Sequence, residues 1–299
     1  MGCLSRKALP LKYSQNKASN LQQVKNTKAI VTLNIGEKLE ERFKSVFLPA
    51  WELYGERHGI TIVNITRTLD DSPRAAARSP AWQKLLVHRA VEVSDFERIA
   101  WVDSDIMIRP DAPDVFSVVP HDKVGAVDDY GSPSREDHAA MIDALYGKWD
   151  VKGVPYINNR TPREYYSNYG IDCTLDTVVQ TGVMVYSPEI HGKLLERVYE
   201  TYEEGASSAL NHEMRPLSYE LLTAGLLHWI SPKFNMQWSY YKQLYYPFLD
   251  DPKSLEVLRW PKISARKKVL SASVQTAFRN NYFLHFAGGS KDYRFVALD

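Results

Sequence analysis

Residues 98–110 read Arg98-Ile-Ala-Trp-Val-Asp103-Ser-Asp105-Ile-Met-Ile-Arg109-Pro110, and this stretch sets the expected fold. Its beginning, 98–102, is mainly apolar, which is typical of a buried strand, and it leads directly into two carboxylates. Burial of uncompensated carboxylates is unfavourable, so a cation, a basic partner or protonation has to balance them. A hard divalent cation suits two oxygen ligands, although a surface turn or an aspartate cap explains the tripeptide equally well.

Strand and helix patterns alternate on both sides of this stretch. Apolar, strand-like runs cover 29–33, 60–65, 98–102, 124–127 and 178–186. Helical spacing of apolar residues marks 39–54, with a kink expected at Pro49, then 82–93 and a stretch beginning at about Pro188. This alternation predicts an α/β fold with a single, mostly parallel, Rossmann-like central sheet and helices on both faces. Ligands of such sheets bind beyond the carboxyl ends of the strands, where the aspartates at 103, 105, 128 and 129 fall.

Composition excludes several classes of protein. The 299 residues carry 37 basic and 36 acidic side chains, so the electrostatic signature of a general nucleic-acid binder is missing. A mean hydropathy of -0.36 and the lack of any long uncharged apolar run predict no membrane span. The 2 cysteines are too few for a disulfide framework or a thiolate zinc site, and they are compatible with a reducing, cytoplasmic location.

The chain divides into two unequal parts. Residues 1–28 contain basic side chains and no acidic one, and we expect a disordered leader that is able to contact a membrane surface peripherally. Residues 29–299 are expected to form one domain. Within it, 131–170 is rich in charge, Tyr, Asn and Pro, and this composition suggests an insertion over the site that selects an acceptor.

A second motif lies near the C-terminus, in Tyr282-Phe-Leu-His285-Phe-Ala-Gly288-Gly-Ser-Lys291. A short strand would deliver one imidazole, two glycines would let the backbone approach a ligand, and the lysine would meet phosphate. His285 combined with two aspartates makes a mixed nitrogen and oxygen set that suits Mn²⁺ and tolerates Mg²⁺. Taken alone, the histidine is more typical of a hydrogen-bonded structural residue.

Together the two motifs resemble metal-dependent glycosyltransferases of the GT-A fold, especially the retaining glycosyltransferase family 8, with its D-x-D and its C-terminal H-x-x-G-x-x-K. The residues 81–84 and 101–105 are also similar to family 34. The resemblance implies a metal held by Asp103, Asp105 and His285. It also implies that Gly288 and Lys291 contact the diphosphate of a nucleoside diphosphate sugar, commonly a uridine diphosphate sugar, and Ser104 is grouped with these cofactor contacts. The reaction implied is hexosyl transfer to a carbohydrate or other hydroxyl acceptor, with retention of configuration.

Further residues match the family less closely. Asn34 occupies the place of a nucleoside contact, but it is equally typical of a turn. Lys84 and Arg78, on or before the helix that leads to the D-x-D, are candidates to reach phosphate or the donor sugar, and a solvated helix face is the alternative. Asp128 or Asp129 resembles the carboxylate that binds donor-sugar hydroxyls.

Three residues are candidates for stabilising the reacting sugar: Glu213, Gln180 and Asp129. Gln180-Thr-Gly-Val-Met184 resembles the family's N-x-G-V-M with Gln in place of Asn. The family's D-Q-x-x-L-N is matched by Glu213 and Met214 in place of Asp and Gln, which leaves the retaining mechanism less well supported. A glutamate at a helix start is equally able to stabilise the helix dipole.

Other classes of protein share parts of this pattern. A haloacid-dehalogenase-like phosphatase also carries D-x-D after a strand, but Met107 stands where that motif has Thr or Val. A sugar nucleotidylyltransferase would need a glycine-rich loop after Leu33, which is missing. A catalytically silent sugar-binding relative remains an alternative. The aromatic stretch 238–248 is suited to stacking on a carbohydrate, to core packing or to forming a lid.

Overall fold

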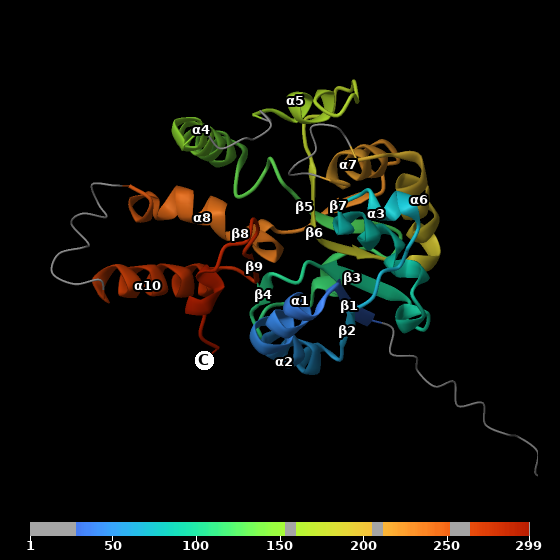
Figure 1. Ribbon diagram of the computed structural model, residues 1–299, viewed down its shortest axis with the longest axis horizontal. Coiled ribbons are helices and arrows are strands. Elements are labelled where there is room, and N and C mark those ends of the chain that lie inside the picture. The colour runs from blue at the N-terminus through green and yellow to red at the C-terminus, as the bar shows by residue number, and fades with distance from the viewer. Residues whose placement is uncertain (1–27, 153–159, 205–211, 252–263, 299) are drawn as a thin grey trace, which may run out of the picture.

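The structure is a computed structural model that describes residues 28–152, 160–204, 212–251 and 264–298 (Figure 1). The expected leader therefore lies outside the described residues except for Lys28, which begins the first strand. Part of the expected insertion, 153–159, also lies outside them. No helix in the described ranges combines the length and the apolar character needed to cross a bilayer.

A six-stranded sheet forms the centre of the fold, in the order β2-β1-β3-β6-β5-β7. Its strands are β1 (Lys28–Leu33), β2 (Thr61–Ile65), β3 (Arg98–Val102), β5 (Val124–Asp128), β6 (Val179–Tyr186) and β7 (Leu227–Trp229). Strand β1 pairs in parallel with β2 and β3, and β5 pairs in parallel with β7. Strand β6 runs antiparallel to both β3 and β5. The predicted mostly parallel α/β sheet is confirmed.

A second, smaller sheet was not predicted. It has the order β4-β9-β8 and consists of β4 (Ile106–Ile108), β9 (Phe283–His285) and β8 (Met236–Gln237). Strand β4 runs antiparallel to β9 and pairs Ile106 with His285, while β8 runs parallel to β9. The D-x-D motif is thus the link between the two sheets, because β3 ends at Val102 and β4 begins at Ile106.

The helices cover both faces of the large sheet. The α-helices of the described ranges are α1 (Glu37–Arg42), α2 (Leu48–His58), α3 (Pro73–Ala76), α4 (Arg135–Lys152), α5 (Pro162–Ser167), α6 (Pro188–Thr201), α7 (Met214–Thr223), α8 (Trp238–Tyr245) and α10 (Ser264–Asn280). Successive residues of β3 belong to separate cores: Ala100 packs with α2 and α10, and Trp101 packs with α6 and α7. This alternation follows from the two-residue period of a strand. Helices α4 and α8 pack on each other, and α8 also packs on α10 (Figure 1).

Two predicted helices differ from expectation. Most of the apolar face at 39–54 is buried from Phe43 onward, whereas Leu39 in α1 is exposed. A π-helical turn, Phe43–Phe47, joins α1 to α2, and Pro49 sits in the first turn of α2, where a missing N–H is tolerated. The predicted helix over 82–93 is instead a pair of 3₁₀ helices, Pro80–Arg89 and Val91–Val93. Periodicity alone does not separate these two helix types over so short a stretch.

Candidate metal centre and active site

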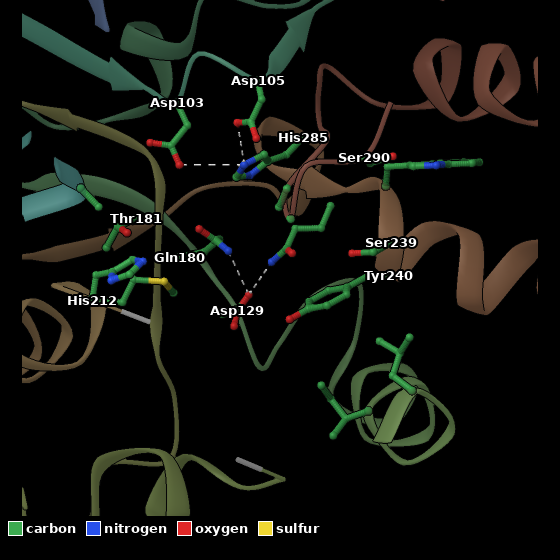
Figure 2. Close-up of a pocket in the computed structure, with 18 of the residues that line it drawn as sticks. Asp103, Asp105, Asp129, Gln180, Thr181, His212, Ser239, Tyr240, His285 and Ser290 are labelled. Carbon is green, nitrogen blue, oxygen red and sulfur yellow. Dashed lines mark hydrogen bonds and ion pairs between the residues drawn. The ribbon is translucent and has the colours of Figure 1, made fainter. Parts of the chain in front are cut away.

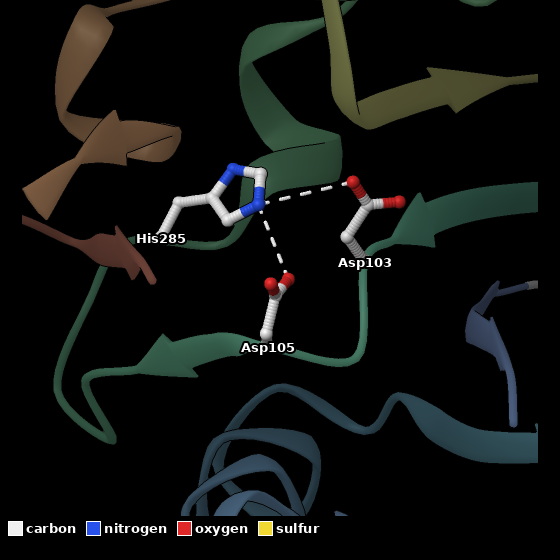
Figure 3. Close-up of side chains that lie close together, drawn as sticks. All are labelled: Asp103, Asp105 and His285. Atoms are coloured by element: carbon white, nitrogen blue, oxygen red, sulfur yellow. Dashed lines mark ion pairs between the residues drawn. The ribbon is translucent and has the colours of Figure 1, made fainter. Parts of the chain in front are cut away.

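Asp103, Asp105 and His285 meet at the junction of the two sheets (Figure 3). The backbone N–H of Asp103 donates to the carbonyl of Gly182 in β6 at 2.9 Å, and the N–H of Phe286 donates to the carbonyl of Asp105 at 3.0 Å. His285 Nε2 lies 3.1 Å from Asp105 Oδ1 and 3.9 Å from Asp103 Oδ2. One ligand atom from each of the three residues lies within 4.8 Å of the other two.

The orientation of His285 is set from two sides. Its Nδ1 lies 2.9 Å from Oδ1 of Asn235, so the Nδ1–H donates to that amide oxygen and Nε2 is left facing the carboxylates. Gly182 lies against the ring, and a Cβ at that position would be 2.8 Å from Cε1 of His285. Two carboxylates and an imidazole held in one tautomer are a donor set that fits Mn²⁺ or Mg²⁺.

The three groups influence one another electrostatically. Burial lowers the pKa of His285, but the adjacent carboxylates of Asp105 and Asp103 together raise it by more. The net pKa is therefore above the ordinary value. Burial raises the pKa of Asp105, but His285 outweighs it and the net pKa is lowered. For Asp103, burial dominates over the attraction of Lys84 and His285, and its pKa is raised.

Lys84 connects the metal centre to Glu213. Its Nζ lies 3.2 Å from Asp103 Oδ1 and 2.9 Å from Glu213 Oε1. Glu213 also accepts a hydrogen bond from Thr181 Oγ1 at 2.9 Å, and Asp103 accepts one from Trp101 Nε1 at 2.8 Å. Burial lowers the pKa of Lys84, but the two carboxylates raise it above its ordinary value. The lysine is 5% exposed, so it does not lie on a solvated helix face.

Asp129 follows β5 and lies buried between two glutamine side chains (Figure 2). Its Oδ1 accepts hydrogen bonds from Gln180 Nε2 at 3.4 Å and from Gln237 Nε2 at 3.2 Å. Gln180 is oriented in turn because its Oε1 accepts from the N–H of Gly182 at 2.9 Å. Burial, followed by the charge of Asp128, raises the pKa of Asp129 to about 7.

These groups line one cavity of about 810 Å³, within the range of small-molecule sites. The predicted site residues that line it are Lys84, Asp103, Asp105, Asp129, Gln180, Glu213, His285 and Gly288. Gly288 and Gly289 have φ of 71° and 73°, a left-handed conformation that favours glycine, and this turn brings their backbone to the cavity.

Other predicted residues lie elsewhere. Asn34 is buried, and its Nδ2 donates to Asn64 Oδ1 at 2.7 Å. Arg78 is held by Glu203 and by the carbonyl of Tyr199. Asp128 accepts hydrogen bonds from the backbone N–H groups of the two residues that follow Asp129. Ser104 and Lys291 also do not line the cavity, and Lys291 is exposed. The binding roles of these residues stay predictions.

Several residues in or beside the cavity were missed by sequence reasoning. Asn235, which orients His285, and Gln237, which lines the cavity, lie at or beside the two-residue strand β8, which is too short to show a pattern. Thr181 lies within the predicted β6 strand but was not singled out. Much of the remaining cavity wall is aromatic and aliphatic and comes from α4, α5, α8 and the turn after β5. The rest includes Ser239 and Lys242 on α8 and residues beside α7 and in the turn after β9.

No protein-family model matches the sequence, and no curated protein matches it. Among solved structures, the chain is similar to a glycosyltransferase involved in the glycosylation of the major capsid of PBCV-1. The sequence identity is 12%, the match covers 90% of this chain and 97% of that chain, and the TM-score is 0.49. A likeness this distant does not bear on the function of the present chain, for which the geometry of the cavity is the relevant observation.

Proposed function

We propose that this chain is a metal-dependent glycosyltransferase of the GT-A type. It would transfer a hexosyl group from a nucleoside diphosphate sugar, with uridine diphosphate the expected carrier, to a hydroxyl acceptor with retention of configuration. The observation that carries the proposal is the convergence of Asp103, Asp105 and His285, whose ligand atoms lie within 4.8 Å of one another at the edge of a cavity of about 810 Å³. A cytoplasmic location, no nucleic-acid partner and peripheral membrane contact by the leader belong to the same proposal.

The three ligand residues would hold Mn²⁺ or Mg²⁺, as their donor set fits. When bound, the cation supplies positive charge that stabilises the departing diphosphate. The backbone of Gly288, at the cavity edge, would let the diphosphate approach closely, and Lys291 would contact it from just beyond the glycine turn. Ser104 and Asn34 are proposed as the remaining nucleotide contacts.

The reacting sugar would lie toward Asp129, Gln180 and Glu213. In the transfer, the acceptor oxygen bonds to the anomeric carbon as the bond from that carbon to the diphosphate oxygen breaks. The hydroxyl proton passes to the departing phosphate oxygen, so attack and departure occur on the same face. Asp129 would bind the sugar hydroxyls, because its Oδ1 is held in place by two amides. Its ionised form, which predominates above about pH 7, would supply negative charge near the developing oxocarbenium ion. Glu213 would supply fixed negative charge through its pair with Lys84.

Release of nucleoside diphosphate tests the proposal. Wild-type protein with Mn²⁺ and a panel of sugar nucleotides should release it, and Asp105→Ala and His285→Ala should not. The control variants are Asp111→Ala and His121→Ala, which replace the same residue types outside the cavity. Undiminished turnover in both site variants would contradict the metal assignment.

Two further outcomes would identify the rival functions. Rapid hydrolysis of an aryl phosphate would favour a phosphatase of the haloacid-dehalogenase type. A metal-dependent rise in the melting temperature with a sugar nucleotide, without release of nucleoside diphosphate, would favour a catalytically silent sugar-binding protein, because a ligand that binds the folded state stabilises it.

A further inference from the structure

One wall of the cavity consists of four neighbouring rings. Tyr130 follows β5, His138 lies on α4, Tyr165 on α5 and Tyr240 on α8, and all four line the cavity. Their centroids are 5.7 Å apart from Tyr240 to His138, 4.7 Å from His138 to Tyr130 and 6.1 Å from Tyr130 to Tyr165. The rings therefore form a continuous surface, here called the aromatic wall.

The aromatic wall carries no charge near neutral pH. Burial lowers the pKa of His138 to about 4, with the backbone of Ser132 opposing this only in part, so its imidazole is neutral. Burial also raises the pKa of Tyr130, Tyr165 and Tyr240 above that of an ordinary phenol. Most of the charged residues that line the cavity belong to the candidate metal centre and its surroundings. Lys242 on α8 also lines the cavity, but its charge is balanced by Asp250, whose Oδ1 lies 3.2 Å from its Nζ. A phosphate is therefore expected at the metal centre, and an uncharged group at the aromatic wall.

The aromatic wall also contains polar atoms that lack partners. The hydroxyl of Tyr165 is buried and has no hydrogen-bond partner within the described part of the chain. The imidazole of His138 is also buried, and the backbone of Ser132 can pair with only one of its two ring nitrogens. Each of these two residues is 2% exposed. Buried polar groups are normally hydrogen-bonded, and a neutral imidazole and a phenol each offer one donor and one acceptor. A ligand rich in hydroxyls would satisfy them after a small shift of the side chains, whereas a hydrocarbon chain would not.

The aromatic wall adjoins the position proposed for the donor sugar. Asp129 directly precedes Tyr130, and Figure 2 shows Asp129 beside Tyr240, with the group of Asp103, Asp105 and His285 above both. Transfer requires the acceptor hydroxyl to lie against the anomeric carbon of the donor, so the acceptor site has to be the next surface along the cavity.

We propose that the aromatic wall binds an uncharged pyranose ring of the acceptor. The apolar face of the sugar packs on the tyrosine rings, and its hydroxyls bond to His138 and Tyr165. That this sugar is an acceptor rests on the proposed function, whereas its binding requires no turnover. The acceptor is accordingly a neutral glycoside, and a sugar phosphate or an apolar alcohol binds poorly.

Calorimetric titration of the full chain tests this proposal. The probes are methyl pyranosides of the common neutral hexoses, 6-deoxyhexoses and pentoses, the matching hexose 6-phosphates, and cyclohexanol. At least one methyl pyranoside should bind at least tenfold more tightly than its phosphate and than cyclohexanol. Binding of none of the pyranosides, or tighter binding of a phosphate, would overturn the proposal.

Two pairs of variants locate the binding. Tyr165→Phe removes one hydroxyl and should weaken pyranoside binding at least fivefold. Its control is Tyr186→Phe, because Tyr186 in β6 also has a buried hydroxyl without a partner among the described residues but does not line the cavity. Tyr240→Ala should weaken binding at least fivefold, whereas Tyr245→Ala on the same helix, 50% exposed, should not. Equal affinity across each pair would place the sugar elsewhere and contradict the proposal.

Hydrolysis of the donor without an acceptor separates the two proposals. Release of nucleoside diphosphate from the donor in water, measured on the wild-type chain, reports donor turnover without any acceptor. Pyranoside binding at the aromatic wall without any donor turnover would support the sugar-binding proposal and contradict the transferase function. Donor turnover without pyranoside binding would support the transferase function and contradict the sugar-binding proposal.

Discussion

Lys84 and Glu213 form an ion pair of 2.9 Å in which the side chains are only 6% and 2% exposed. The lysine comes from the 3₁₀ helix that precedes β3, and the glutamate comes from the residue before α7. The same ammonium lies 3.2 Å from Asp103 Oδ1, so one buried cation balances carboxylates from two segments. Loss of that cation would leave Glu213 buried, and Asp103 partly buried, without a balancing charge.

Lys84→Met should therefore lower the free energy of unfolding by about 3–5 kcal/mol, as for other broken buried pairs. Urea denaturation without added metal measures the change. The matched control is Lys44→Met, which breaks the exposed Lys44–Glu40 pair within a helix and should change the free energy of unfolding by about 0.5 kcal/mol or less. The double variant Lys84→Met/Glu213→Gln should recover part of the loss. Equal effects of the two lysine substitutions would show that the buried pair contributes no more to the free energy of unfolding than the exposed pair does.

Gly182→Ala should weaken Mn²⁺ binding at least tenfold, by analogy with other changes around metal ligands. The added Cβ would lie 2.8 Å from Cε1 and 3.0 Å from Nδ1 of His285, so the imidazole has to move. Gly192→Ala is the control, because its Cβ would lie 2.6 Å from Cδ2 of His88, a histidine outside the cavity. Both variants should be less stable, but calorimetry should find weaker metal binding only in the first. Unchanged Mn²⁺ affinity in Gly182→Ala would argue against His285 as a ligand.

Asn235→Ala should also weaken Mn²⁺ binding, by about 10- to 100-fold, because loss of a ligand's hydrogen-bond partner has effects of this size. The amide oxygen of Asn235 accepts from Nδ1 of His285 at 2.9 Å and so holds the tautomer that presents Nε2. Asn281→Ala is the control: Asn281 is another buried asparagine, its Nδ2 donates to the carbonyl of Ala277 at 2.8 Å, and it does not line the cavity. If both variants bind Mn²⁺ as the wild type does, orientation of the imidazole by Asn235 is unimportant for the metal.

Asp129 should make stability depend on pH in an unusual direction. An aspartate in an unfolded chain titrates near ~3.9, whereas the pKa of Asp129 is raised to about 7, first by burial and then by Asp128. Between these values the folded state keeps a proton that the unfolded state has lost, so the free energy of unfolding falls as pH rises from about 4 to about 7. The contribution lost over that window is on the order of 4 kcal/mol at full effect.

Urea denaturation with a chelator, at intervals from pH 4.5 to 8, measures this contribution. Asp129→Asn should flatten the fall, and Asp128→Asn should move it to lower pH because it removes a like charge. Asp95→Asn, at an exposed position, should leave the profile as in the wild type. A wild-type profile identical to that of Asp129→Asn would contradict the raised pKa.

Much of the large sheet was predictable because its strands are buried on both faces. Residues 98–102 and 178–186 are nearly continuous apolar runs, a pattern that few other environments accommodate. The two aspartates of the candidate metal centre could also be singled out, because carboxylates at the end of such a run need compensation. His285 required the resemblance to a family motif, since a single histidine carries no spacing of its own.

The rest depends on contacts between distant segments. Strands β4 and β8 have 3 and 2 residues, too few for alternation to distinguish them from loops. Lys84 is buried because it pairs with Glu213, which is distant in the sequence. No pattern near either residue predicts this pair. The aromatic wall likewise draws one ring from each of four segments, so no single segment reveals it.

The pairing of β4 with β9 determines when, during synthesis of the chain, His285 can join the two aspartates. Strand β9, which brings His285 opposite Ile106, joins the second sheet only after the chain has been synthesised to residue 285. Side chains alternate between the faces of a strand, so a slip of one residue in this pairing would turn the imidazole away from the aspartates. A nascent or truncated chain that stops before β9 would therefore lack the complete ligand set, even with its large sheet assembled. The ability to bind the metal would thus arise late in biosynthesis. It would require that β4 and β9 have paired in the correct register.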